Sequence, residues 1–421
     1  MGFDFDEIID RKNTSSLKWN CGENELPMWV ADMDFKTAPE IIRALKLRLE
    51  HGIFGYSEIG DDWYDAYASW WSRRHGLTID KDRLIFCTGV IPAISSTVRK
   101  LTTPNENVVI QTPVYNIFFN SILNNGCRVL ENALIYENGE YRMDFEDLEK
   151  KLAHPQTTLM ILCNPQNPTG KIWDKESLEK VGELCFKHGV TVIADEIHCD
   201  ITSPGKNYVP FASVSDTCRD ISITCMAPTK AFNIAGLQTA AVYVPNLKLY
   251  YKIWRALNTD EVAEPNAFAI AAAVAAFGEG EAWLDEMNAY VKANKDFARD
   301  FVAANIPGVH VVEGDATYLI WLDINGVEAK LCAAVAGSKT SAADAGSKSN
   351  AAEAGTKAGI AGKSYSEFAA SYIREKTGLW LCEGREYGEA GEGFLRMNVA
   401  CPRSVLADGL NRLKSALMED I

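Results

Sequence analysis

The stretch Thr224–Asn233, TCMAPTKAFN, decides the fold because it leads the chain from a buried strand into a turn with reactive side chains. It overlaps the mostly apolar run Asp220–Cys225 (DISITC), which predicts a buried strand of a parallel sheet. The turn carries Thr229 and Lys230 among small and apolar residues. Partial desolvation lowers the pKa of an amine, and a neutral amine attacks carbonyls. Lys230 is therefore a candidate for a Schiff base, although this stretch alone also fits a solvated loop lysine.

The composition excludes several classes of protein. The chain has 421 residues, enough for two domains, and a formal charge of −15, which disfavours nucleic acids and anionic membranes as partners. No apolar run approaches about 18 residues, and the acidic N-terminus lacks the pattern of a secretion signal. The 11 cysteines form no CxxC pair, and Cys87, Cys163 and Cys225 stand in apolar runs. We therefore expect reduced core thiols in a cytoplasmic protein.

Strand and helix patterns alternate between Arg83 and Val244. The apolar runs are LIFC, NVVIQ, CRVL, TLMILC, VTVIAD, ISITC and AAVYV, and helical stretches include 114–125, 144–152 and 175–188. This alternation predicts an α/β fold with a mostly parallel sheet covered on both faces. Ligands of such sheets bind at the carboxyl ends of the strands. We also expect a loop at 51–60, a helix at 61–75 and helical structure over 247–305.

Polar residues follow two of these runs. NPQNPTG (Asn164–Gly170) is a rigid turn that presents Asn167 at the end of TLMILC, and VTVIAD ends on Asp195. A strand that ends in Asp-Glu also resembles the magnesium site of a P-loop nucleotidase, but no GxxxxGK[ST] occurs. The absence of GxGxxG after a strand disfavours a nicotinamide enzyme.

An amine, a carboxylate and an amide at one sheet edge suit pyridoxal 5′-phosphate. Its aldehyde needs an amine (Lys230), its pyridine nitrogen a buried carboxylate (Asp195), and its ring oxygen a donor (Asn167). Its phosphate needs backbone N–H groups, and Gly89-Val90-Ile91 would supply them where a helix opens at Pro92.

These motifs resemble a known family. The chain is similar to fold-type-I pyridoxal-phosphate enzymes of the class-I/II aminotransferase superfamily, and more narrowly to the bacterial cystathionine β-lyase (C–S lyase) subgroup. The resemblance rests on LPMWVADMDF, FGYSE, TGVIPAI, QTPVYNIFF, NPQNPTG, ADEIHCDI, APTKAFNIAGLQTA and FLRMNVACPR, which stand in the family's order. It implies a large domain with a mostly parallel sheet and a smaller α+β domain.

The resemblance also implies domain bounds. Residues 1–50 would join the small domain, residues 51–279 would form the large cofactor-binding domain, and residues 280–421 the small C-terminal domain. The segment near 333–363 is rich in Ala, Gly, Ser and Lys, so we expect a surface insertion without chemistry, with an Ala-rich helix as the alternative.

The resemblance assigns roles to single residues. It implies that Lys230 forms the Schiff base, that Asp195 pairs with the pyridinium, that Asn167 donates to the ring oxygen, and that Tyr115 stacks on the ring. Tyr56 would reach the phosphate held by a neighbouring subunit, where it is also assigned a catalytic and a substrate-binding role, so a homodimer with shared active sites is expected.

Further roles concern the substrate and two departures from the family pattern. Arg396, with the backbone of Ala31, would bind the substrate α-carboxylate. Many relatives have Ser where this chain has Ala227, so Thr229 would have to supply the hydroxyl for the phosphate. His198 replaces a Tyr that donates to the ring oxygen in typical aminotransferases, and its contact is left unassigned.

The leading hypothesis is α,β-elimination from cystathionine or another S-substituted cysteine, with Lys230 as the base at Cα. A pyridoxal-phosphate aminotransferase is the alternative, because both reactions begin from the same carbanion. A regulatory protein that binds a transcription factor is the third possibility, for which the sequence gives no specific signal.

Overall fold

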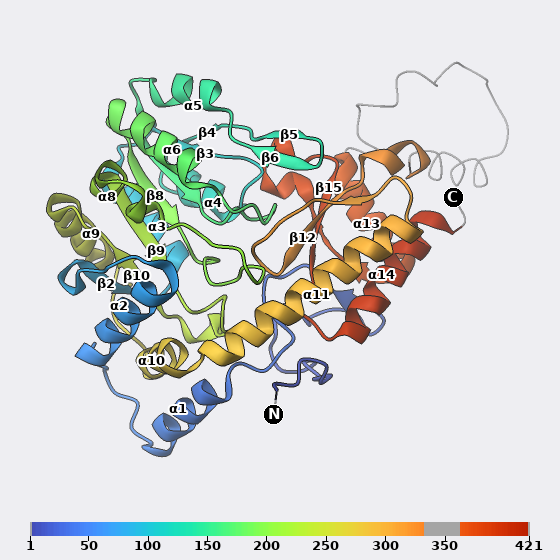
Figure 1. The fold of residues 1–421 in the computed structure, drawn as a ribbon, viewed down its shortest axis with the longest axis horizontal. Coiled ribbons are helices and arrows are strands. Elements are labelled where there is room, and N and C mark those ends of the chain that lie inside the picture. Colours follow the sequence, from blue (N-terminus) through green and yellow to red (C-terminus); the bar gives the residue numbers. More distant parts are fainter. Residues whose placement is uncertain (1, 332–362, 420–421) are drawn as a thin grey trace. The chain divides into compact units, whose positions relative to one another are not determined.

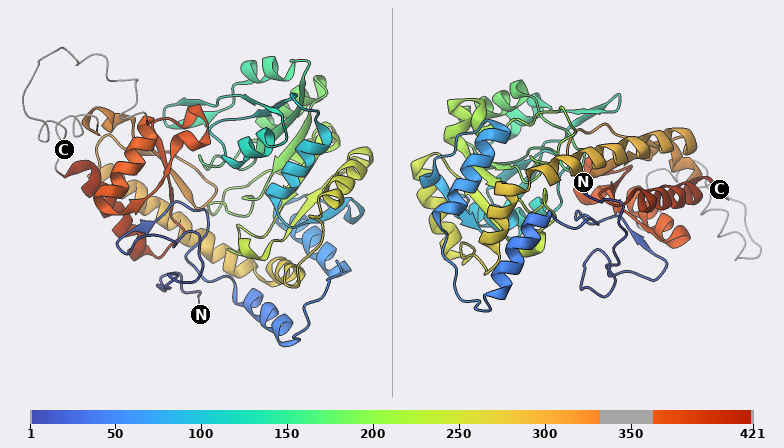
Figure 2. Two further views of the ribbon diagram at one scale, coloured as in Figure 1. Left: turned by 180° about the vertical axis from the view of Figure 1, so that it is seen from behind. Right: turned by 60° about the horizontal axis from the view of Figure 1, so that its bottom comes forward.

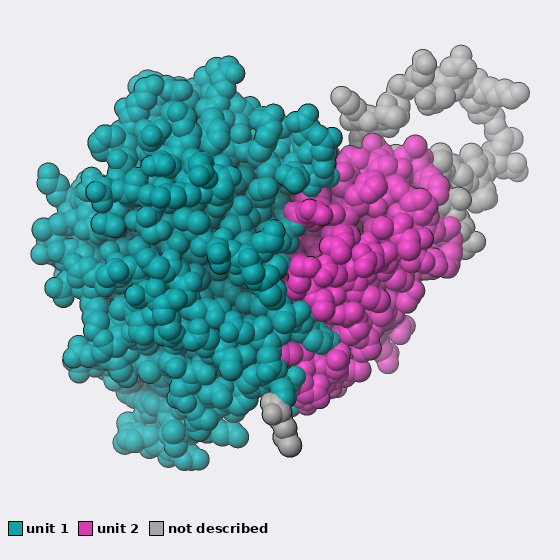
Figure 3. All heavy atoms as spheres, in the orientation of Figure 1, with its two compact units in different colours: residues 1–3, 35–290, 314–317 teal, residues 4–34, 291–313, 318–421 magenta. Residues whose placement is uncertain are grey.

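The computed structural model describes residues 2–331 and 363–419, so all but the last residue of the segment 333–363 lies outside it. The described chain divides into two compact units, coloured in Figure 3. Unit 1 comprises residues 1–3, 35–290 and 314–317, and unit 2 comprises residues 4–34, 291–313 and 318–421. Among the described residues, no helix has the length and apolar character that crossing a membrane requires.

Unit 1 is built on a seven-stranded sheet with the order β2-β10-β9-β8-β7-β3-β4 (Figure 1). Only β10 runs antiparallel to its two neighbours, so the predicted α/β fold with a mostly parallel sheet is confirmed. The strands are β2 (Leu84–Cys87), β3 (Asn107–Ile110), β4 (Arg128–Glu131), β7 (Thr157–Cys163), β8 (Thr191–Asp195), β9 (Ser222–Met226) and β10 (Ala240–Tyr243). Each of the seven apolar runs forms one of them.

Helices cover both faces of this sheet (Figures 1 and 2). On one face lie α3 (Val90–Leu101), α4 (Ile117–Leu123) and α9 (Leu247–Thr259); on the other lie α5 (Phe145–Leu152), α6 (Lys175–Lys187), α7 (Phe211–Val214) and α8 (Asp216–Ile221). Alternate strand residues such as Ile110, Ile161 and Ile193 pack with α3, α4 and α9 in one buried cluster. Burial on both faces explains why these strands read as continuous apolar runs.

Some other helices begin or end at residues that differ from those predicted from the sequence. The expected helical region 247–305 is three helices: α9, α10 (Ala269–Glu279) and α11 (Glu281–Asn305). The chain leaves α9 with Glu261 at φ 57°, and Pro265 lacks the N–H that a continuing helix needs. The expected helix 114–125 is the shorter α4. The predicted helix at 61–75 is α2 (Asp61–His75), and the predicted loop at 51–60 joins it to α1 (Pro39–Glu50). A hairpin of β5 (Ile135–Glu137) and β6 (Glu140–Arg142) was not predicted.

Unit 2 contains an antiparallel sheet with the order β11-β12-β15-β14. The strands are β11 (His310–Val311), β12 (Leu319–Asp323), β14 (Cys382–Glu383) and β15 (Phe394–Asn398); β1 (Leu26–Pro27) pairs with β13 (Leu379–Trp380); and the last helices are α13 (Tyr365–Thr377) and α14 (Arg403–Met418). Trp321 stacks on Phe394, with ring centroids 5.2 Å apart. Two parts of the segment 4–34 are joined by an ion pair. The buried Lys18 has its Nζ 2.7 Å from Asp34 Oδ2.

Candidate active site

Three central strands deliver their carboxyl ends to one edge of the unit 1 sheet. In the ladder, Cys163 at the end of β7 pairs with Asp195 at the end of β8, which pairs with Cys225 in β9. The chain after each strand therefore begins at the same level. Lys230 follows β9 by four residues, and its positive charge lowers the pKa of the Asp195 carboxyl. The predicted amine is thus near enough to the carboxylate for its charge to act on it.

Asp195 is a buried carboxylate at the end of β8 that accepts a hydrogen bond from the backbone. Its Oδ1 accepts a hydrogen bond from the Ile197 N–H at 3.1 Å, and its strand neighbours Cys163 and Cys225 are buried thiols. Burial raises the pKa of Asp195 to about 7, against the opposing effects of the Ile197 N–H and the Lys230 charge. A site that disfavours an isolated anion so strongly favours a carboxylate paired with a cation.

Glu196 was not singled out from the sequence, although it is also fully buried. Strand residues alternate between faces, so Asp195 shares a face with Ile193 while Glu196 points to the opposite one. There its Oε1 accepts from the Phe211 N–H at 2.8 Å and from Asn164 Nδ2 at 3.4 Å. Burial raises the pKa of Glu196 to about 7. The alternation in VTVIADE distinguishes the two acids, and Glu196 serves to tie α7 to the end of β7.

These two acids give the apoprotein a specific pH dependence. The pKa of Asp195 rises from 3.8 to about 7 on folding, so the folded state keeps a proton that the unfolded chain has lost. The stabilisation is complete below the unfolded pKa and is lost as the pH rises to about 7, a change of at most ~4 kcal/mol. Asp195→Asn removes this dependence.

We expect the stability of the wild type and that of the Asp195→Asn variant to depend differently on pH. The free energy of unfolding of the Asp195→Asn apoprotein should increase relative to that of the wild type as the pH rises from about 4 to about 7. Urea unfolding of the two apoproteins at several pH values measures this difference. A difference that stays constant with pH contradicts the assigned burial cost.

The NPQNPTG turn is fixed by side chains and by a close backbone approach. Asn167 is buried in it. Gln166 Nε2 donates to the carbonyls of Gln111 at 2.9 Å and Pro113 at 2.8 Å, which joins the turn to the segment after β3. Gly170 has φ 72°, and a Cβ there would lie 2.8 Å from the Ala316 carbonyl oxygen. Gln166 is a second residue that the sequence analysis missed, because a glutamine between two Asn-Pro steps reads as an ordinary turn residue.

The predicted phosphate-binding stretch lies at the same edge. Because β2 and β9 both run antiparallel to β10, the carboxyl end of β2 lies with those of β7, β8 and β9. Gly89 is the N-cap of α3, which begins at Val90 rather than at Pro92, and the Gly89 carbonyl accepts from the Ala93 N–H at 3.1 Å. The N–H groups of Val90 and Ile91 precede the first intrahelical bond, so they are oriented as anion donors.

The other predicted residues of unit 1 differ in exposure. Tyr115 is half-buried after β3 and meets Phe118 edge-on, with ring centroids 5.9 Å apart. Thr229 and His198 are buried. Tyr56, in contrast, is fully exposed, so unit 1 as described does not bring it together with the residues at the sheet edge.

The predicted substrate-binding residues belong to unit 2. Arg396, in β15, is 4% exposed; its Nη2 donates to the Trp29 carbonyl at 2.9 Å, and its guanidinium lies 4.9 Å from the centre of the Tyr387 ring. The Ala31 carbonyl accepts from the Tyr318 hydroxyl at 2.9 Å. Arg396 and the segment around Ala31 are thus parts of one hydrogen-bonded arrangement within unit 2.

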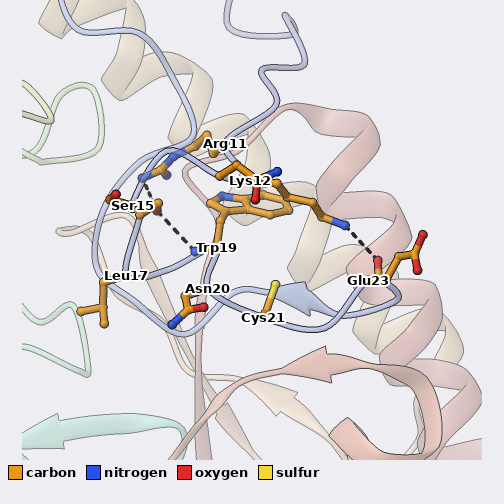
Figure 4. Close-up of a pocket in the computed structure, with 10 residues that line it drawn as sticks. Arg11, Lys12, Ser15, Leu17, Trp19, Asn20, Cys21 and Glu23 are labelled. Carbon is orange, nitrogen blue, oxygen red and sulfur yellow. Dashed lines mark hydrogen bonds between the residues drawn. The ribbon is translucent and has the colours of Figure 1, made fainter.

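The described part of the chain has two other features that could hold a ligand, a surface hollow and a cluster of possible metal ligands. A hollow of about 760 Å³ is lined by residues 11–23 of unit 2, among them Trp19 and Lys12, and it includes none of the predicted residues (Figure 4). In unit 1, His75, Cys199 and Asp200 have ligand atoms within 4.8 Å of one another. Asp200 Oδ1 lies 2.8 Å from His75 Nε2 and accepts from Trp70 Nε1 at 2.9 Å. Burial raises the pKa of the Cys199 thiol well above its ordinary value. Trp70 and His75 both belong to α2, so their bonds to Asp200 anchor this helix.

A model of the family "Aminotransferase class I and II" matches residues 23–413. The chain belongs to this family. Cystathionine β-lyase PatB of Bacillus subtilis (strain 168) is 41% identical over 98% of this chain and 99% of the relative. A PLP-bound C–S lyase from Staphylococcus hominis has 31% identity and a TM-score of 0.85, covering 100% of this chain and 99% of that one. Cystalysin from Treponema denticola, which contains pyridoxal 5′-phosphate, has 29% identity and a TM-score of 0.87, with 99% of each chain covered.

The residues present fit the cofactor that family membership implies. A buried carboxylate with a raised pKa, an adjacent lysine and a helix N-terminus lie at the edge where six parallel strands end. These groups match a pyridine nitrogen, an aldehyde and a phosphate, in that order.

Proposed function

We propose that this chain is a pyridoxal-phosphate-dependent C–S lyase that cleaves cystathionine or related S-substituted cysteines. The observation that carries the proposal is the buried Asp195 carboxylate, whose pKa responds to Lys230 at one sheet edge. The relatives support the choice of reaction, since a cystathionine β-lyase is 41% identical over 98% of the chain. His198, in place of the tyrosine of typical aminotransferases, supports the same choice.

The cofactor, when bound, supplies an electron sink for the pair that remains on the substrate Cα after proton removal. Lys230 Nζ takes the Cα proton, and its position beside an apolar sheet edge keeps the amine partly desolvated. Asp195 would pair its carboxylate with the pyridine nitrogen, and Asn167 would donate to the ring oxygen. The N–H groups at the start of α3, with the Thr229 hydroxyl, would bind the phosphate. Arg396 and the Ala31 N–H bind the substrate α-carboxylate.

The overall reaction balances without an oxidant or a second substrate besides water. The Cα–H and Cβ–S bonds break, the sulfur leaves as a thiolate and takes a proton, and the remaining aminoacrylate is hydrolysed. One S-substituted cysteine and one water thus give a thiol, pyruvate and ammonia. An aminotransferase, in contrast, would need a keto acid as second substrate to accept the amino group, and it would release no thiol.

An assay without added keto acid distinguishes a lyase from an aminotransferase. The holoenzyme is incubated with L-cystathionine, and pyruvate and free thiol are measured over many turnovers. The proposal predicts equal amounts of both products with no keto acid present. A single turnover that resumes only after 2-oxoglutarate is added would overturn it in favour of an aminotransferase.

We further propose that the enzyme is a homodimer in which Tyr56 serves the partner's cofactor phosphate. The support is an exposed apolar segment that ends at Tyr56, with Leu47, Leu49, Ile53 and Phe54 all more than half exposed. Several exposed large apolar side chains in one short segment are typical of an interface.

Subunit complementation tests this arrangement. Lys230→Ala and Tyr56→Ala subunits are mixed, unfolded together and refolded, and each variant is assayed alone as the control. If Tyr56 acts in the partner's site, each hybrid dimer has one intact site, so activity should recover to about a quarter of the wild-type value. Activity that stays at the level of the separate variants, with dimers formed, would show that Tyr56 does not act across the interface.

We also infer a cytoplasmic location. Nine of the ten described cysteines are buried and all ten are free thiols, as expected in a reducing compartment.

A further inference from the structure

Asn398 lies at the end of β15 and is 1% exposed. Both the nitrogen and the oxygen of its side-chain amide form hydrogen bonds with backbone groups. Its Nδ2 donates to the Val30 carbonyl at 2.7 Å and to the Asp32 carbonyl at 2.6 Å. Its Oδ1 accepts from the Ala400 N–H at 2.8 Å. One side chain therefore holds two carbonyls that flank Ala31.

The two carbonyls fix the direction of two N–H groups. In a planar trans peptide the C=O of one residue and the N–H of the next point in opposite directions. The Val30 carbonyl points to Asn398, so the Ala31 N–H points away from it. By the same geometry the Asp32 carbonyl directs the Met33 N–H. Asn398 thus determines where the Ala31 amide can donate.

The neighbouring carbonyls are held by other side chains of unit 2. Arg396, two residues before Asn398 on the same face of β15, donates from Nη2 to the Trp29 carbonyl at 2.9 Å. The Tyr318 hydroxyl donates to the Ala31 carbonyl at 2.9 Å. Lys18 Nζ and Cys382 Sγ also donate, to the Asp32 and Trp29 carbonyls. Four consecutive carbonyls, from Trp29 to Asp32, are therefore anchored by side chains of unit 2.

We propose that Asn398 is a positioning residue for recognition of the substrate α-carboxylate. It acts through the Val30 carbonyl, which orients the Ala31 N–H so that this amide and the Arg396 guanidinium bind the same carboxylate. The inference rests on the proposed function, in which Arg396 and Ala31 bind that group. It adds that the carboxylate site depends on a side chain that does not itself touch the substrate.

The test compares two small amines with and without a carboxylate. Holoenzyme with Asn398→Ala is titrated with L-alanine and with ethylamine, and the change in cofactor absorbance gives each dissociation constant. The affinity for L-alanine should fall about tenfold, the value of a hydrogen bond to a charged group, while that for ethylamine stays within about twofold. The KM for L-cystathionine should rise more than kcat falls.

Asn294→Ala is the matched control. Asn294 is also fully buried, and its Nδ2 also donates to two backbone carbonyls, those of Val399 at 2.8 Å and Cys401 at 2.9 Å. Its loss should destabilise the protein comparably but leave the ratio of the two dissociation constants unchanged. Equal changes in this ratio for both variants would overturn the proposal and leave Asn398 a purely structural residue.

A milder variant keeps the test decisive if Asn398→Ala yields no holoenzyme. The backbone N–H of Asn398 still donates to the Met28 carbonyl at 2.8 Å in any variant, which favours folding. Asn398→Ser keeps a single donor, so it cannot hold both carbonyls, and it should also weaken L-alanine binding relative to ethylamine. An unchanged ratio in every variant that yields holoenzyme refutes the inference. Wild-type holoenzyme that gives no spectral response to L-alanine and no thiol from cystathionine would instead refute the proposed function.

Discussion

Lys230→Ala is expected to lower pyruvate release from cystathionine by at least about a thousandfold, because it removes both the base at Cα and the amine that attaches the cofactor. The visible absorbance of the cofactor–lysine linkage should disappear in the same variant. The measurements are a steady-state pyruvate assay and an absorbance spectrum after incubation with excess pyridoxal 5′-phosphate.

Lys187→Ala is the control for this experiment. Lys187 ends α6 in an exposed ion pair with Glu149, so its loss should leave both activity and spectrum unchanged. Retained lyase activity in Lys230→Ala would contradict the role assigned to this amine.

Asp195→Asn is expected to reduce kcat/KM by about a hundred- to a thousandfold. The variant loses the charge that keeps the pyridine nitrogen protonated, and removing one partner of a buried charge pair costs about 3–5 kcal/mol. The amide keeps the size of the side chain, so the loss reports charge rather than packing. The same substitution should stabilise the apoprotein near neutral pH, which would separate the functional role of Asp195 from any structural one.

Glu196→Gln offers a matched comparison within the same two residues. Glu196 is equally buried and its pKa is also raised to about 7, but its side chain leaves β8 on the opposite face. Its variant should therefore keep kcat/KM within about tenfold of the wild type, since only the bond to α7 is weakened. Comparable losses in the two variants would mean that burial of an acid, rather than contact with the cofactor, controls activity.

Much of unit 1 was predictable because both faces of its sheet are buried. The seven strands are apolar along their whole length, and the residues with chemistry stand directly after them, where parallel strands end together. Lys230 and Asp195 lie 35 residues apart, but one βαβ crossover suffices to bring their strands side by side. The helix boundaries after β10 were harder to place, because one break depends on a positive φ at Glu261 and the other is a single residue, Gly280.

The remaining features depend on contacts between distant parts of the chain. Gln166 reads as a turn residue until its hydrogen bonds to the segment after β3 are seen. Asn398 lies more than 360 residues from Val30, and no local pattern marks a side chain that holds two carbonyls so far away. Tyr56 is an exposed loop residue in one chain, so its role depends on a second copy that a single sequence does not describe.

Covalent mapping of the cofactor is the most direct test that Lys230 and Asp195 bind one ring. Holoenzyme is reduced with borohydride, digested and analysed by mass spectrometry, with Asp195→Asn treated in parallel. Our account predicts that the phosphopyridoxyl group is found on the peptide that contains Lys230, and that the Asp195→Asn protein retains less cofactor at equal concentration. A label on another lysine of an active enzyme, or unlabelled protein that still releases pyruvate, would contradict it.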